Sequence, residues 1–158
     1  MNNSPLQQHI LNLLSFKGAH IDFEDAIRGL APGLRGKKIK GAPHTIWQLL
    51  EHMRIAQWDI LEFSRDEKHV SPEFPEGYWP DSAAPPSEAA WKKSVAAFRR
   101  DLDAMKQLVA EADERQLYAR IPHGDGQTLL REALLVADHN AYHLGELVLL
   151  RRLLGAWR

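Results

Sequence analysis

The stretch of sequence that decides the fold is 128–155, TLLREALLVADHNAYHLGELVLLRRLLG. It contains no proline and carries leucines throughout its length at helical spacing. Thr128 supplies a hydroxyl suited to a helix N-cap, and Gly155 stands where a residue in the left-handed conformation commonly ends a helix. Two arginines in the last turn complement the helix dipole. The stretch therefore predicts one long helix from Thr128 to about Leu154.

Three further stretches repeat apolar residues at helical spacing, and Pro and Gly residues separate them. Capping residues and these breaks place the additional helices at about 5–30, 45–64 and 87–111. The start of the second is the best marked, because Thr45 and Gln48 fit the two ends of a capping box. Gly18 is expected to bend or break the first.

The connection 66–86 is unusually long and contains five prolines. Loops of this length inside a compact domain are usually functional, as a lid, a wall or a crossover. Phe74, Tyr78 and Trp79 would be costly to leave exposed as a cluster. We therefore expect the connection to pack against the protein near an opening.

The chain is all-α, and its predicted architecture is a four-helix bundle with a long connection between helices 2 and 3. No stretch shows the alternation of a strand, and 158 residues suit a single domain over 1–158. Bundle cores are common hosts for metals and ligands. The cores of the predicted helices are therefore the place to look for chemistry.

Composition excludes several kinds of site. The chain has no cysteine, which rules out disulfides, thiolate nucleophiles and cysteine-ligated metal centres. A net charge of -1 offers no general attraction to nucleic acid or to an anionic membrane. No apolar run is long enough to span a bilayer, and the first residues do not have the pattern of a signal peptide. We expect a cytoplasmic protein without nucleic-acid or membrane partners.

Two histidines in the last predicted helix are four residues apart. His139 and His143 therefore project from one face, about one turn from each other. Leu135, Leu147 and Leu150 share or border that face, so both rings are expected inside the bundle. Such a pair can bind one metal ion, although hydrogen-bonded core or surface histidines are the simpler alternative.

A third histidine strengthens the metal hypothesis. His52 lies between Leu49 and Ala56 on the apolar side of the second predicted helix. Three neutral imidazoles bind Zn, Ni, Fe or Cu and leave a coordination position open, which is typical of catalytic sites. Two familiar metal motifs are absent: Asn140 stands where a zincin protease needs glutamate, and no Glu-x-x-His motif of the di-iron bundles occurs.

The segments 49–53, LLEHM, and 137–145, ADHNAYHLG, resemble the DinB/YfiT-like metalloenzymes. The resemblance covers most of the chain, including the order of the helices and the capped starts of the second and fourth. In that family three histidines bind a divalent metal, which implies His52, His139 and His143 as the ligands here. Its better understood relatives are similar in fold to thiol-cofactor-dependent S-transferases and isomerases, but the resemblance does not supply a reaction.

Other residues have both a functional and a structural interpretation. His44 could bind substrate or shuttle protons at the mouth of the site, or contact the loop at the helix start. His20 could lie behind the ligands and orient them, or simply pack in the core or on the surface. His123 sits in a Gly/Pro-rich loop that leads into the last helix, and such loops often carry function. His9 and His69 are expected at the surface.

Three residues near the ligands in sequence could accept a hydrogen bond from an imidazole N–H and so orient it. They are Glu51, Asn140 and Glu146, and helix phase argues only weakly among them. Trp79 could form a wall of the pocket.

The residues support three functional hypotheses. The first is a metal-dependent enzyme in which one divalent ion, zinc or nickel, activates water or an external low-molecular-weight thiol. It would catalyse S-transfer, isomerisation or hydrolysis of a small molecule. The second is a non-catalytic metal-binding or stress-response protein, and the third is a metal-free helical scaffold. Spare apolar surface on long helices makes a homodimer plausible.

Overall fold

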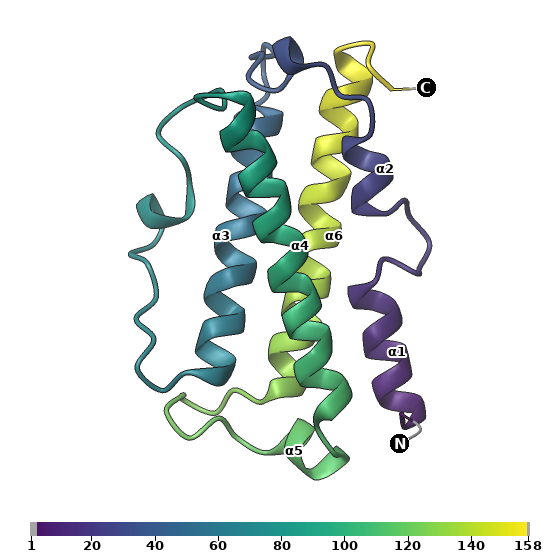
Figure 1. Cartoon of the computed structure of the whole chain (residues 1–158), viewed down its shortest axis with the longest axis vertical. Coiled ribbons are helices and arrows are strands. Elements are labelled where there is room, and N and C mark those ends of the chain that lie inside the picture. The colour runs from purple at the N-terminus through teal and green to yellow at the C-terminus, as the bar shows by residue number, and fades with distance from the viewer. Residues whose placement is uncertain (1–2, 158) are drawn as a thin grey trace.

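The computed structural model describes residues 3–157, and within that range it contains six α-helices and no β-strand (Figure 1). The helices are α1 (Pro5–Leu14), α2 (Phe23–Ile27), α3 (Ile46–Arg65), α4 (Glu88–Glu111), α5 (Glu114–Tyr118) and α6 (Leu129–Leu153). Two short 3-10 helices, η1 (Pro32–Leu34) and η2 (Glu76–Tyr78), lie in the connections. The prediction of an all-α chain is confirmed.

Three long helices, α3, α4 and α6, run side by side along the molecule, with α1 and α2 in line beside them (Figure 1). Helix α3 packs on both α4 and α6, and α1 packs on α4 and α6. This arrangement is consistent with the predicted four-helix bundle, with α1 and α2 sharing the fourth position. Among the residues described, no helix is both long enough and apolar enough to cross a membrane.

The first predicted helix, 5–30, is two helices, and the segment between them, residues 15–22, contains Gly18. Ser15 ends α1, and Phe16 adopts a left-handed conformation with φ of 54°. Asp22 then caps α2 by accepting a hydrogen bond from the amide of Asp25. The expected break at Gly18 is therefore confirmed, although the N-cap at Asp22 that starts the second helix was not predicted.

The other predicted helix limits agree with the structure to within a residue or two. Thr45 and Gln48 form the predicted capping box of α3, and Ser87 and Thr128 cap α4 and α6. Gly155 has φ of 68°, as expected for the residue that ends the last helix. Sequence reasoning missed three short elements within predicted loops: α5 and the 3-10 helices η1 and η2.

The core consists of apolar side chains from the facing sides of α1, α3, α4 and α6. The largest fully buried ones include Ile10, Leu14, Leu50, Met53, Leu61, Phe98, Met105, Leu144 and Leu147. A buried polar chain crosses this core, in which Asn140 donates to Gln57 and Gln57 donates to the carbonyl of Phe98. These hydrogen bonds fix the relative positions of α3, α4 and α6.

The connection between α3 and α4 spans residues 66–87 and lies along the outer side of α3 (Figure 1). Its aromatic residues do not behave alike. Trp79 is half-buried and packs against the core, whereas Phe74 is 76% exposed. Phe74 contacts Tyr78, with 5.9 Å between ring centroids, but it does not pack against the body of the protein as expected.

Candidate metal centre

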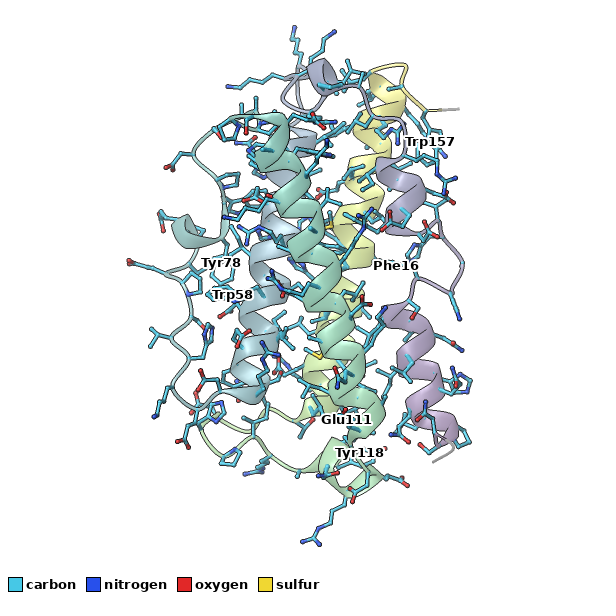
Figure 2. The ribbon with its side chains drawn as sticks, in the orientation of Figure 1. Phe16, Trp58, Tyr78, Glu111, Tyr118 and Trp157 are labelled. Atoms are coloured by element: carbon cyan, nitrogen blue, oxygen red, sulfur yellow. The ribbon has the colours of Figure 1, made fainter. Side chains whose placement is uncertain are left out.

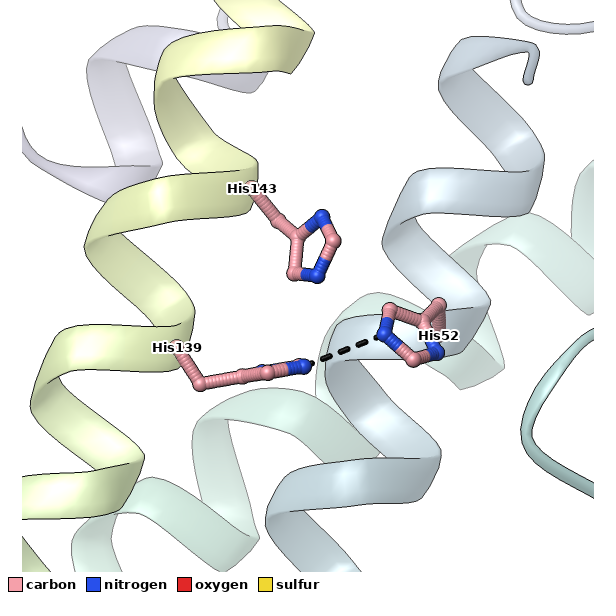
Figure 3. Close-up of side chains that lie close together, drawn as sticks. All are labelled: His52, His139 and His143. Atoms are coloured by element: carbon pink, nitrogen blue, oxygen red, sulfur yellow. Dashed lines mark hydrogen bonds between the residues drawn. The ribbon is translucent and has the colours of Figure 1, made fainter. Parts of the chain in front are cut away.

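Three histidines from two helices converge inside the bundle (Figure 3). His52 comes from α3, and His139 and His143 come from successive turns of α6. One ring nitrogen of each lies within 4.8 Å of the others. His52 and His143 are buried and His139 is half-buried, so the cluster is largely shielded from solvent. The structure thus brings together the three residues that the sequence predicted as ligands.

The spacing of the nitrogens suits a small ion. Nε2 of His139 lies 3.0 Å from Nε2 of His52. Ligand nitrogens at about 2.0–2.1 Å from a metal are about 2.8–3.4 Å apart when the angle between them is roughly 90–110°. His52 and His139 therefore have the spacing of two metal ligands, and a ring nitrogen of His143 lies within 4.8 Å of both.

Hydrogen bonds fix the orientation and tautomer of two of the rings. Nδ1 of His52 lies 3.0 Å from the carbonyl oxygen of Tyr78, and Nδ1 of His143 lies 2.7 Å from a carboxylate oxygen of Glu146. Carbonyl and carboxylate oxygens only accept, so each Nδ1 carries the proton and donates it. Each Nε2 is then left with a free lone pair, as metal ligation requires.

His139 completes the set in a different way. Its Nε2 either donates to Nε2 of His52 or, when the proton sits on Nδ1, presents a third free lone pair. Burial, and then the proximity of His143 and His52, lowers the pKa of His139 to about 3. Burial also lowers the pKa of His52, against the opposing hydrogen bond to the carbonyl of Tyr78. Neutral imidazole is the form that binds metals, so both rings are in that form at pH 7.

Trp79 holds His52 from the side of the long connection. Its ring is stacked on His52 at 3.9 Å between centroids and 2° between planes, and it is stacked on His44 at 3.8 Å and 12°. The indole thus lies between the two imidazoles. The sequence-based expectation that Trp79 forms a wall fits this position.

His44 is therefore close to the three histidines without belonging to the group. Burial lowers its pKa, Glu146 opposes that effect and His143 adds to it. Its stacking on Trp79 is a contact with the long connection, and a role in binding substrate or moving protons stays a prediction.

Asp59 anchors the segment that orients His52. One carboxylate oxygen accepts a hydrogen bond of 2.5 Å from the hydroxyl of Tyr78, and the other lies 2.7 Å from Nε2 of His69. Burial, reinforced by the bond to Asp59, raises the pKa of Tyr78 to about 12, so the hydroxyl keeps its proton. Figure 2 labels Tyr78 on the side of α3 where the connection lies. Tyr78 thus binds α3 at two points, through its carbonyl to His52 and through its hydroxyl to Asp59.

His69 was expected at the surface, and this was wrong. Its side chain is only 8% exposed and pairs with Asp59. Nothing in the sequence near His69 signals this, because Asp59 is ten residues away in the preceding helix.

Of the three residues proposed to orient a ligand, Glu146 occupies that position. Glu51 instead pairs with Arg54 at 2.8 Å, and Asn140 donates to Gln57 at 2.8 Å. Asn140 is completely buried, and its side-chain oxygen has no protein partner. It belongs to the polar chain across the core.

Two further histidines lie apart from the cluster. His20 is exposed in the loop between α1 and α2, and its ring contacts the carbonyl of Ile21 at 2.8 Å. His123 is also exposed, and its ring contacts the carbonyl of Phe63 near the C-terminal end of α3. His52 lies in the N-terminal half of the same helix. The structure shows neither His20 nor His123 in contact with the three histidines.

Comparison with known proteins gives one match. A family model described as DinB superfamily matches residues 16–147, a range that includes the three histidines, Asp59, Tyr78, Trp79 and Glu146. No curated protein and no solved structure matches the chain.

Proposed function

The chain belongs to the DinB superfamily, and from this membership and the geometry of the three histidines we propose that it is a metal-dependent enzyme acting on a small molecule. One divalent ion would be held by His52, His139 and His143. Zinc and nickel are the proposed metals, because imidazole ligands suit both and availability in the cell would decide between them.

One observation carries the proposal. Two imidazoles from different helices are oriented by acceptors on Nδ1, so that their Nε2 atoms point toward each other and toward a third histidine. A histidine that merely fills the core does not need this arrangement. Three protein ligands also leave at least one coordination position, which is the pattern of catalytic zinc sites.

When bound, the ion would act as a Lewis acid that lowers the pKa of a coordinated thiol or water and polarises an electrophile. The chain has no cysteine, so a thiol would be an external low-molecular-weight cofactor. The proposed reactions are S-transfer, isomerisation or hydrolysis.

The residues around the ligands have defined roles in this proposal. Glu146 holds the ring of His143, and a carboxylate in that position increases the basicity of the imidazole. Tyr78 and Trp79 hold His52 by a hydrogen bond and by stacking. The metal ligands are thus positioned by side chains and backbone from two segments of the chain, which keeps their geometry fixed as a substrate binds.

The first experiment is metal analysis of protein purified without a histidine tag, for the wild type and for His139→Ala. His123→Ala is the matched control, since His123 is away from the cluster. We expect close to one ion per chain in the wild type and the control, and little in His139→Ala. Equal and negligible metal in all three would overturn the proposal.

The second experiment tests catalysis. The metal-loaded protein is screened for consumption of low-molecular-weight thiols with electrophiles and for ester and amide hydrolysis. Activity that disappears in His139→Ala supports an enzyme. Tight metal binding without turnover would instead favour a non-catalytic metal-binding protein.

A further inference from the structure

We propose that the cavity next to the three histidines binds an apolar group of the substrate, so that the enzyme acts on molecules with a metal-binding head and an alkyl or aryl tail. This inference rests on the proposed function, because the head is assigned to the metal. The cavity itself is a feature of the fold and can be tested separately.

The three histidines do not line the cavity themselves, but residues next to them on both ligand helices do. On α3, Leu49 lines it, one turn before His52. On α6, Glu146 and Leu150 line it, one and two turns after His143. The distance from His143 to Leu150 along the helix is about 10 Å at 1.5 Å per residue. A molecule bound at the histidines would therefore extend along this face into the cavity.

Two polar side chains of the cavity lie toward the histidines. Glu146 lines it and bonds to His143, and His44 lines it and stacks on the tryptophan that covers His52. Beyond them the walls are apolar, with Leu149, Leu150 and Leu153 from α6. One polar end beside an apolar chamber is the usual design of a small-molecule site.

The size of the cavity and its charges define the ligand further. Its volume is about 310 Å³, which is near the lower limit for ligand pockets. Lys40 is the only cationic side chain among its lining residues, and it is exposed. A polyphosphate or a sugar would find few polar partners here. A compact hydrocarbon group fits the walls better.

Two leucines of the cavity wall expose apolar surface to water, which is unfavourable, and a bound apolar group would cover that surface. Leu149 is 55% exposed and Leu153 is 60% exposed, and both lie on the same side of α6 as the cavity. Residues 39–43 form the opposite side, so a tail lying between that segment and the leucines would be covered on both sides. A second copy of the chain could also cover the leucines, and the tests below distinguish that case.

The first test probes the cavity without reference to the metal. The full-length protein, labelled at leucine methyl groups, is titrated with 1-hexanol and observed by NMR. Shifts are expected at Leu149, Leu150 and Leu153 and not at Leu134, a 41% exposed leucine on the same helix outside the cavity. No shift at the three leucines would overturn the inference. Shifts that follow protein concentration instead of hexanol would assign the face to a dimer and also overturn it.

The second test connects the cavity to the metal. The metal-loaded protein is titrated calorimetrically with hydroxamates of increasing alkyl length, from acetohydroxamate to octanohydroxamate. Each methylene that enters the cavity should tighten binding about fourfold, until the tail fills the space. Leu149→Ser/Leu153→Ser should flatten this dependence without changing the affinity for acetohydroxamate. Leu134→Ser should leave both unchanged.

The outcomes separate the two proposals. If acetohydroxamate binds but the affinity does not rise with chain length, the apolar subsite is wrong and the metal centre stands. If no metal binds while 1-hexanol still shifts the three leucines, the metal centre is wrong and the cavity is an apolar site of another kind.

Discussion

Replacing Glu146 tests whether the hydrogen bond to His143 prepares a metal ligand. The carboxylate lies 2.7 Å from Nδ1 of His143, and the two residues are three apart on α6. Glu146→Gln keeps an acceptor oxygen at the same reach and removes the charge. Glu146→Ala removes both the charge and the acceptor, so the ring can turn and can change its tautomer.

The expected magnitude follows from the role of this bond. Mutation of a group that orients a metal ligand costs roughly 10–100-fold in metal affinity, or about 1.4–2.7 kcal/mol. His143 is buried whereas Glu146 is 36% exposed, so solvent weakens the electrostatic part. We therefore expect about a tenfold loss for Glu146→Gln, and a loss approaching 100-fold for Glu146→Ala.

The assay is a competition titration in which a chromophoric chelator and the protein share zinc at pH 7.5. Glu62→Gln is the matched control. Glu62 also forms an ion pair with a residue three positions away, Arg65, but this pair lies at the C-terminal end of α3. The Glu62→Gln variant should bind zinc as the wild type does. Wild-type affinity in both Glu146 variants, or equal losses at Glu62, would refute the role assigned to Glu146.

Three further predictions follow from the site. His139→Ala should lose most of the bound metal and keep its helical circular dichroism spectrum, and the control His123→Ala should match the wild type in both. Wild-type metal affinity in His139→Ala would show that the three-histidine site is wrong. Because folding lowers the pKa of His139 from 6.5 to about 3, the unfolded chain binds a proton below pH 6.5 that the folded chain does not. The free energy of unfolding should therefore fall as the pH drops below 6.5, by at most about 1.4 kcal/mol per pH unit. Urea unfolding of the apo-protein at pH 7 and pH 5 measures this fall, which should be smaller in His139→Gln than in the wild type. Tyr78→Phe should leave Asp59 without one partner and speed proteolysis of the connection 66–87, at a cost of about 1–3 kcal/mol in unfolding free energy; an unchanged proteolysis rate would contradict the anchoring role.

The helices that could be predicted from the sequence are those whose signals are local. Thr45 and Gln48 form their capping box through hydrogen bonds between residues three positions apart. The sequence pattern therefore predicts the contact directly. The break between α1 and α2 was also encoded locally, by the cap at Asp22. Gly18 marked the break in the sequence, but the start of the second helix was not predicted because the apolar periodicity continues through the break.

The three histidines of the proposed metal site were predictable for a similar reason, whereas the backbone contact that orients His52 was not. His139 and His143 are related by helix geometry alone, and His52 lies on the apolar side of its own helix. Contacts that join distant segments leave no periodic trace in the sequence. The carbonyl of Tyr78 reaches His52 across 26 residues, and a backbone oxygen carries no residue-type signal at all.

The long connection shows how these two kinds of information combine in one site. Its length and aromatic content predicted a wall near an opening, and Trp79 was the aromatic residue proposed to form it. In the structure, the stacking of Trp79 on His52 and the hydroxyl bond from Tyr78 to Asp59 select the residues that pack, while Phe74 remains exposed. The connection therefore positions a ligand that α3 alone would leave free to rotate. Loss of that anchoring should weaken metal binding through the orientation of His52, even though no residue of the connection is a proposed ligand.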